Sequence, residues 1–209
     1  MGANKGDWSA ALLKLKPKFG KLLVCEPQAS LRPSLVNLLA PSHDVFIEQV
    51  AVGASPGDMV LYADHAGSPL ASMYHRDISH YNISMDQQQT VSVTTVDLLL
   101  EKYELASVSF LKLDAEGHEF EILKGAQHSL SDCRIRALSF EFGGCNIDSR
   151  TYFKDFWQLL VREHGYSMFR ILPSRLLLRL KEYSETLEQF NWQTVLACAP
   201  GQTPSWRVV

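Results

Sequence analysis

Two carboxylates stand where a predicted strand gives way to a predicted helix. Asp114 and Glu116 follow the apolar run of residues 109–113, and a helical pattern begins a few residues later. In open α/β sheets, ligands bind at the carboxyl ends of the strands. Both residues are therefore candidates for a general base or for positioning a substrate. Acidic residues also stabilise the first turn of a helix by about 0.3–1 kcal/mol each, and we expect Glu119 and Glu121 to do only that.

A glycine-containing loop is the second candidate. Gly2-Ala3-Asn4-Lys5-Gly6 precedes a helical pattern and then an apolar run that ends at Glu26-Pro27. Glycines let the backbone approach a ligand closely, and an acidic side chain about twenty residues further on can bind both ribose hydroxyls. The pattern indicates a nucleoside-cofactor site, with a plain loop as the alternative. The spacing is not GxGxxG, which disfavours a dinucleotide.

Two further features favour structural interpretations. Gly143-Gly144, after the run of residues 137–142, is typical of a tight turn, although it could also let a substrate approach the backbone. His118 has no second histidine, cysteine or carboxylate at metal-ligand spacing, so we expect no metal site and place this histidine behind the site at most.

Apolar runs that alternate with helical patterns position these residues. They predict a single α/β domain over residues 1–209, with a mostly parallel sheet and helices on both faces. We expect strands at residues 21–25, 45–52, 59–62, 90–96, 109–113 and 137–142, with residues 166–172 and 192–199 as a closing antiparallel pair. We expect helices at residues 7–15, 33–39 and 151–164. Residues 63–89 are polar and aperiodic, which predicts a surface loop that could serve in binding or as a lid.

Composition excludes some classes of partner. Of 209 residues, 46% are hydrophobic and 21% are charged, and the net charge is −3, so no field of one sign would attract nucleic acid or an anionic membrane. The four cysteines are widely spaced, which indicates reduced thiols. The sequence shows no signal peptide and no apolar run of the ~20 residues that a membrane span needs. We therefore expect a cytoplasmic protein.

Taken together, the motifs resemble the FkbM-like methyltransferase family. Residues 2–6 are similar to the end of its Asp-Val-Gly-Ala-Asn-Xaa-Gly cofactor motif. Residues 113–119 and 122–126 are similar to its Asp-Val-Glu-Gly-Xaa-Glu and Leu-Lys-Gly-Ala segments, and residues 50–53 and 94–97 also fit. The resemblance implies a class I, Rossmann-like methyltransferase fold that uses S-adenosylmethionine.

The resemblance also implies roles for individual residues. The cofactor-binding set would be Gly2, Ala3, Asn4, Gly6, Glu26, Pro27, Ala51 and Val52. Within it, the glycine loop would line the methionine and ribose side, Glu26 would hold the ribose hydroxyls, and Ala51 and Val52 would approach the adenine. Asp114 and Glu116 would lie near the transferred methyl group, and which of them acts as a base stays open.

The expected activity is methyl transfer to an oxygen of a small-molecule or carbohydrate acceptor. Two alternatives stay open. One is a non-catalytic scaffold or binding protein that keeps the methyltransferase fold. The other is a nicotinamide-dependent oxidoreductase, which the missing GxGxxG spacing disfavours.

The chain departs from the family pattern at its start. The family motif begins on a strand, with an acidic residue two positions before the first glycine, whereas here Gly2 follows Met1. We therefore expect the first strand to be missing, with a gap between the strands that end at Glu26 and Asp114, and Met1 to be an internal residue of a longer protein. Alternatively, a partner chain in a homo-oligomer or a rearranged strand would fill the gap.

Overall fold

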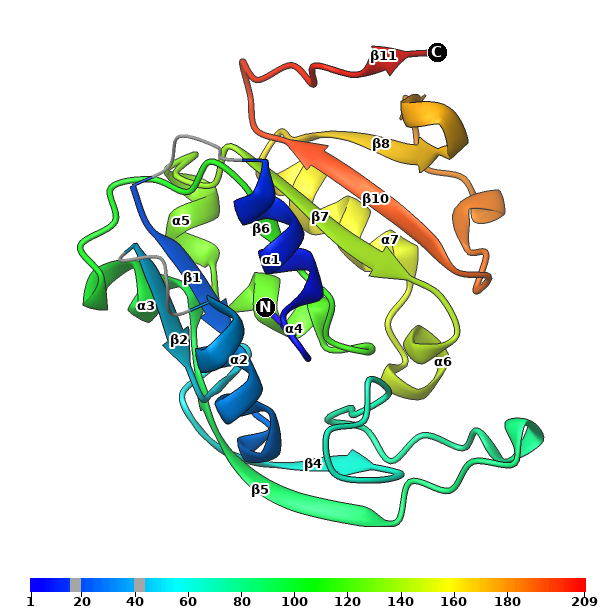
Figure 1. The fold of residues 1–209 in the computed structure, drawn as a ribbon. Helices are drawn as coiled ribbons and strands as arrows, with labels where there is room; N and C mark the ends of the chain where they lie inside the picture. The colour runs from blue at the N-terminus through cyan, green and yellow to red at the C-terminus, as the bar shows by residue number, and fades with distance from the viewer. Residues whose placement is uncertain (16–19, 40–43) are drawn as a thin grey trace.

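The computed structural model describes residues 1–15, 20–39 and 44–209, which form a mixed α/β fold (Figure 1). The α-helices are α1 (Asp7–Lys14), α2 (Arg32–Leu39), α3 (Val96–Lys102), α4 (Glu119–Lys124), α5 (Gln127–Ser131), α6 (Cys145–Ser149) and α7 (Phe153–Phe156), which continues as a π-helix over Trp157–Glu163. The strands are β1 (Leu22–Cys25), β2 (Val45–Glu48), β3 (Ala51–Val52), β4 (Gly57–Ala63), β5 (Gln87–Thr94), β6 (Leu111–Lys112), β7 (Ala137–Phe142), β8 (Ser167–Leu172), β9 (Leu176–Leu180), β10 (Gln193–Cys198) and β11 (Arg207–Val208).

The strands form three sheets, and two of these mix parallel and antiparallel pairs. The largest has the order β11-β9-β8-β10-β7-β6, in which only β6/β7 and β9/β11 are parallel. β1 and β2 form a parallel pair, while β5 pairs in parallel with β3 and antiparallel with β4. The prediction of one mostly parallel sheet is therefore corrected. Short connections such as residues 173–175, between β8 and β9, allow only antiparallel neighbours.

The sheets are separated where the sequence predicts a gap. In the described residues β1 pairs only with β2, and β6 pairs only with β7. The segment of residues 1–3 connects the ends of β1 and β6: the Met1 amine donates to the Lys112 carbonyl at 2.9 Å, and the Gly2 and Ala3 amides both donate to the Cys25 carbonyl at 3.1 Å. Backbone of the glycine loop therefore occupies the boundary between the two sheets.

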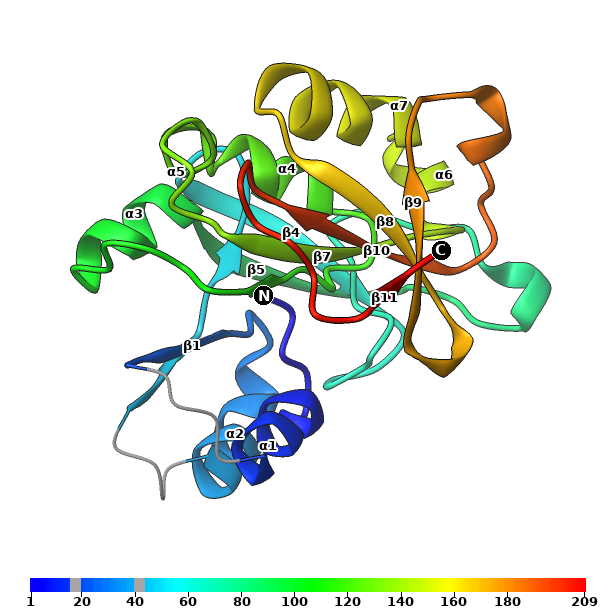
Figure 2. The ribbon, with the colours of Figure 1, turned by 90° about the horizontal axis from the view of Figure 1, so that it is seen from above.

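Helices lie on two sides of the sheets (Figure 2). On one side, α1 and α2 pack on β1 and β2 around the buried residues Val24, Leu35 and Leu39. On the other side, α3, α4, α5 and α7 enclose the main core against β6, β7 and β10. None of the helices in the described part of the chain is long and apolar enough to cross a membrane.

Most element boundaries agree with the sequence within a few residues, and β7 agrees at both ends. β8 and β10 pair antiparallel, as expected. The expected strand at residues 45–52 is two strands, because β2 joins β1 whereas β3 joins β5. The expected strand at residues 90–96 ends at Thr94, because the Thr95 hydroxyl accepts from the Leu98 amide and begins α3.

Gly125, from the Leu-Lys-Gly-Ala segment, ends α4 at a point of close packing. A Cβ atom there would lie 2.0 Å from the Gly53 carbonyl oxygen. We expect Gly125→Ala to lower the free energy of unfolding by about 1–3 kcal/mol and the melting temperature by about 2–4 °C per kcal/mol. Gly144→Ala is the matched control, because a Cβ atom there meets nothing within 4 Å. Equal melting temperatures for the two variants would contradict the packing interpretation.

Candidate functional site

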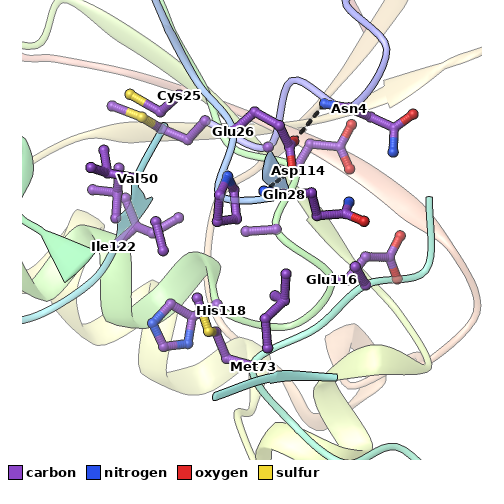
Figure 3. A pocket seen from close by; sticks show the side chains of 18 of the residues that line it. Asn4, Cys25, Glu26, Gln28, Val50, Met73, Asp114, Glu116, His118 and Ile122 are labelled. Atoms are coloured by element: carbon purple, nitrogen blue, oxygen red, sulfur yellow. Dashed lines mark hydrogen bonds between the residues drawn. The ribbon is translucent and has the colours of Figure 1, made fainter. Parts of the chain in front are cut away.

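A cavity of about 290 Å³ lies where β1, β3 and β6 end (Figure 3). This volume is near the lower end for small-molecule sites. Glu26, Asn4 and Gln28 gather at one end of it, whereas His118 and Met73 lie at the other. The lining is formed by Met1, Gly2, Asn4, Cys25, Glu26, Pro27, Gln28, Val50, Ala51, Val52, Leu61, Ser68, Pro69, Ala71, Met73, Asp114, Ala115, Glu116, His118 and Ile122.

Glu26 is a buried carboxylate directly after β1, with 4% of its surface exposed. Oε2 accepts from the Asn4 amide at 2.7 Å, and Oε1 accepts from the Gln28 amide at 3.0 Å. Burial raises the pKa of Glu26 above its ordinary value of 4.5, while these backbone bonds oppose the shift. Each oxygen keeps a second lone pair, so the carboxylate can still accept two hydroxyl groups of a ligand.

Gly2 brings the glycine loop into backbone contact with the loop after β6. It has a φ of 71°, and a Cβ atom on it would lie 1.7 Å from the Asp114 carbonyl oxygen. A residue with a side chain cannot occupy this position without moving one of the two loops. At Gly2 the close approach is between two backbone segments of the chain, and the expected approach of this loop to a ligand stays a prediction.

The loop from Asp114 to His118 carries two residues with positive φ, Glu116 at 49° and Gly117 at 101°. Glu119 holds this conformation, because its carboxylate accepts from the Ala115 amide at 2.6 Å and the Gly117 amide at 3.0 Å. Glu119 is 1% exposed, and burial raises its pKa to about 7. The expectation that Glu119 only stabilises the helix dipole is wrong: it positions the loop that carries both candidate carboxylates.

The two candidate carboxylates have different partners. Asp114 forms an ion pair with Lys112, two residues before it on the same strand end. Glu116 receives the guanidinium of Arg76, with Nη1 to Oε2 at 2.6 Å, and the Arg76 Nε lies 3.5 Å from Asp148 Oδ2. Burial raises the pKa of Glu116, and the adjacent Arg76 opposes that shift. Glu116 is thus engaged by a salt bridge from another segment, whereas Asp114, among the residues that the structure describes, pairs only with Lys112.

The loop of residues 64–86, between β4 and β5, closes one wall of the cavity. Ser68, Pro69, Ala71 and Met73 line it. The Ser72 hydroxyl donates to the Glu116 carbonyl at 2.7 Å, which with Arg76 makes two attachments of this loop to Glu116. The loop predicted from its polar, aperiodic sequence is therefore part of the site.

His118 lies at the apolar end of the cavity beside Ile122. Its Nδ1 is 3.3 Å from the Tyr74 hydroxyl, and its Nε2 is buried without a hydrogen-bond partner among the described residues. Burial lowers the pKa of His118 to about 4, so the ring is neutral near pH 7. The described residues contain no group of three or more histidine, cysteine or acidic side chains that could hold a metal ion.

The structure brings together most, but not all, of the residues that the sequence selected. Gly2, Asn4, Glu26, Pro27, Ala51, Val52, Asp114 and Glu116 all line the cavity. Ala3 and Gly6 lie outside it: Ala3 packs with the α2 core, and Gly6, at a φ of 87°, begins α1 against Leu35. Packing at Ala3 and the positive φ at Gly6 account for these two positions of the motif without ligand contact.

Sequence reasoning missed several lining residues. Gln28 follows Glu26 by two positions, and its side chain donates to the Ser68 carbonyl at 3.0 Å, which ties the end of β1 to the loop of residues 64–86. Ser68 and Met73 carry no local pattern that could have selected them. His118, placed behind the site from the sequence, lines the cavity directly.

The structure is a mixed α/β fold with a cavity at the carboxyl ends of β1, β3 and β6. The methyltransferase FkbM domain model matches residues 1–168, and the chain belongs to the FkbM methyltransferase family. The crystal structure of a methyltransferase FkbM from Methylobacillus flagellatus KT is similar in fold, with a TM-score of 0.57 and 17% identity. The match covers 94% of this chain and 41% of that one, so the chain spans less than half of the solved relative. No curated protein matches the chain.

Proposed function

We propose that this protein is an S-adenosylmethionine-dependent O-methyltransferase of Rossmann-like class I type that acts on a hydroxyl group of a small molecule or a carbohydrate. The main support is that Glu26 and Asp114, which follow strands of different sheets, line one cavity, with Gly2 lying against Asp114. Family membership supports the methyltransferase class.

The lining residues fit a nucleoside cofactor. Glu26 offers acceptors for two ribose hydroxyls, and the close contact at Gly2 leaves backbone rather than side chains along that wall. Ala51, Val52 and Ile122 provide an apolar end suited to a purine ring. S-adenosylmethionine, when bound, supplies an electrophilic methyl group. The protein then has to align the acceptor and remove its proton, and alignment alone can contribute up to about 7–11 kcal/mol.

Asp114 is the better candidate for the proton acceptor. Its side chain is 33% exposed beside the cavity, and Lys112 balances its charge. Glu116 is engaged by Arg76 and by the loop of residues 64–86, so we assign it to holding that loop over the site. The loop forms one wall of the cavity, and a wall that excluded water would strengthen electrostatic interactions inside.

Ligand-dependent melting tests the proposal. We expect S-adenosylhomocysteine to bind in calorimetry and, at 100 times its Kd, to add about 2.7 kcal/mol to the free energy of unfolding. The melting temperature should rise by roughly 2–4 °C for each kcal/mol. NAD is the control and is expected to give no shift.

Other outcomes would select the alternatives. A cooperative melt that neither compound shifts would favour a scaffold that keeps the fold. Binding of NAD without binding of S-adenosylhomocysteine would favour an oxidoreductase.

A further inference from the structure

Trp192 directly precedes β10 of the largest sheet, and most of its side chain is exposed to solvent. Trp192 is 72% exposed, although burial of a large aromatic side chain is usually favourable. Its only polar atom is already satisfied, because the indole N–H donates to Glu141 Oε2 at 2.7 Å. The hydrogen bond holds the N–H edge of the ring, and the rest of its exposed surface is apolar.

Strand register places this ring next to the proposed reacting centre. Lys112 of β6 pairs with Ser139 of β7. Asp114 and Glu141 each lie two residues further on, so their side chains project on the same side at neighbouring strand ends. Burial raises the pKa of Glu141, the Trp192 bond opposes that shift, and the charge of Asp114 adds to it, in agreement with this proximity. Asp114, Glu141 and Trp192 thus follow one another across β6, β7 and the start of β10.

Gly143 allows the backbone at Trp192 to lie close to the end of β7. A Cβ atom on Gly143 would lie 3.2 Å from the Trp192 Cα, which is tighter than ordinary contact, whereas one on Gly144 would meet nothing within 4 Å. The first glycine of the pair therefore lets the segment before β10 approach the end of β7. This close approach sets the position from which the indole reaches Glu141.

Near Asp114, Glu141 and Trp192, carboxylates outnumber basic side chains. Asp114 pairs with Lys112, while Glu116 and Asp148 share Arg76. Glu141 forms no salt bridge within the described residues, and its Oε1 accepts no hydrogen bond there. Four carboxylates against two cations repel an anionic acceptor, and a free carboxylate oxygen can only accept hydrogen bonds. The matching ligand is uncharged and rich in hydroxyl donors.

We propose that Trp192 and Glu141 form an acceptor subsite for an uncharged pyranoside, whose C–H face stacks on the indole while a ring hydroxyl donates to Glu141 Oε1. The axial C–H groups of a pyranose carry partial positive charge, which suits the negative face of an aromatic ring. A sugar held there extends toward Asp114 and presents a neighbouring hydroxyl to it. The inference rests on the proposed function, because Asp114 is the proton acceptor only if the protein transfers a methyl group to oxygen.

The test is saturation-transfer NMR with competition titrations on the protein without cofactor. The probes are methyl β-D-glucopyranoside, methyl β-D-galactopyranoside and methyl β-D-glucopyranosiduronate. We expect the two neutral glycosides to bind, with the strongest transfer to their ring C–H protons, and the uronate to bind at least several-fold more weakly. Trp192→Ala should weaken the neutral glycosides roughly tenfold, and Trp192→Phe should restore part of that loss. Trp206→Ala is the matched control, because Trp206 is 42% exposed and precedes β11 at the opposite edge of the sheet.

Several results would overturn the subsite. These are unchanged affinity in Trp192→Ala, a uronate that binds as well as the neutral glycosides, or a wild-type protein that binds no pyranoside. Melting curves of each variant separate misfolding from loss of the subsite. Titration of the same variants with S-adenosylhomocysteine keeps the two proposals apart: Trp192→Ala should bind it normally, and a wild-type protein that does not bind it would refute the proposed function while the glycoside data stand by themselves.

Discussion

Asp114→Asn is expected to lower turnover by about 10²–10⁴-fold, the usual contribution of a positioned general base, while the affinity for S-adenosylhomocysteine changes little. Asparagine keeps the size of the side chain but cannot take the proton from an acceptor hydroxyl. The loss should appear equally in kcat and kcat/KM, because the interaction is made only as the acceptor reacts. Steady-state kinetics with any acceptor that the protein methylates, together with calorimetry, measure both quantities.

Glu116→Gln is the comparison that tests this assignment. Glu116 is held by Arg76 and by the Ser72 hydroxyl at its carbonyl, so the amide should weaken the attachment of the loop without removing the base. We expect a smaller loss of turnover than in Asp114→Asn. If Glu116→Gln causes the larger loss, the roles of the two carboxylates are reversed.

Glu26→Gln should weaken binding of S-adenosylhomocysteine by about 10- to 150-fold, because hydrogen bonds to a charged group contribute about 1.5–3 kcal/mol. The amide offers one acceptor where the carboxylate offers two, and its NH₂ group faces the amide of either Asn4 or Gln28. Calorimetry gives the affinity, and melting of the free protein reports the part of the effect that is structural. An unchanged affinity in a folded variant would refute the ribose assignment.

The same residue gives this binding a pH dependence. Burial raises the pKa of Glu26 above 4.5, and ribose hydroxyls require the ionised form. Affinity is therefore full above the raised pKa and is lost as the pH falls through it. Titrations from pH 8 down toward the ordinary value of 4.5 should show this decline in the wild type, and Glu26→Gln should bind weakly with a flatter profile.

The parts of the site that the sequence predicts are those fixed by strand ends. Glu26 and Asp114 each follow an apolar run, and the carboxyl ends of such strands meet around one crevice. Both carboxylates do line the cavity. The glycine at residue 2 has a structural reason that the sequence did not reveal, because the contact between Gly2 and the Asp114 backbone excludes any side chain there.

The remaining residues depend on contacts between distant segments, which no local pattern encodes. Arg76 and Glu116 are forty positions apart, and their pairing exists only because the loop of residues 64–86 folds over the end of β6. Glu119 has the sequence position of an ordinary first-turn acid, and only its burial shows that it holds the preceding loop. The prediction of a mostly parallel sheet failed for a similar reason, because short apolar runs do not show which strands they will pair with.

The boundary between the sheets affects how the protein opens locally. β1 and β2 share a ladder with each other but, in the described residues, with neither of the other sheets. Elements with fewer shared hydrogen bonds open at lower free energy than the rest of a domain, a difference that amide hydrogen exchange reports. A ligand that touches Glu26 on one side and Asp114 on the other is lost whenever either side opens, so its binding free energy adds to the protection of both. Cofactor binding would then reduce the difference in exchange between β1 and β6, and the ligand itself would act as a cross-link that makes the opening of the two sheets cooperative.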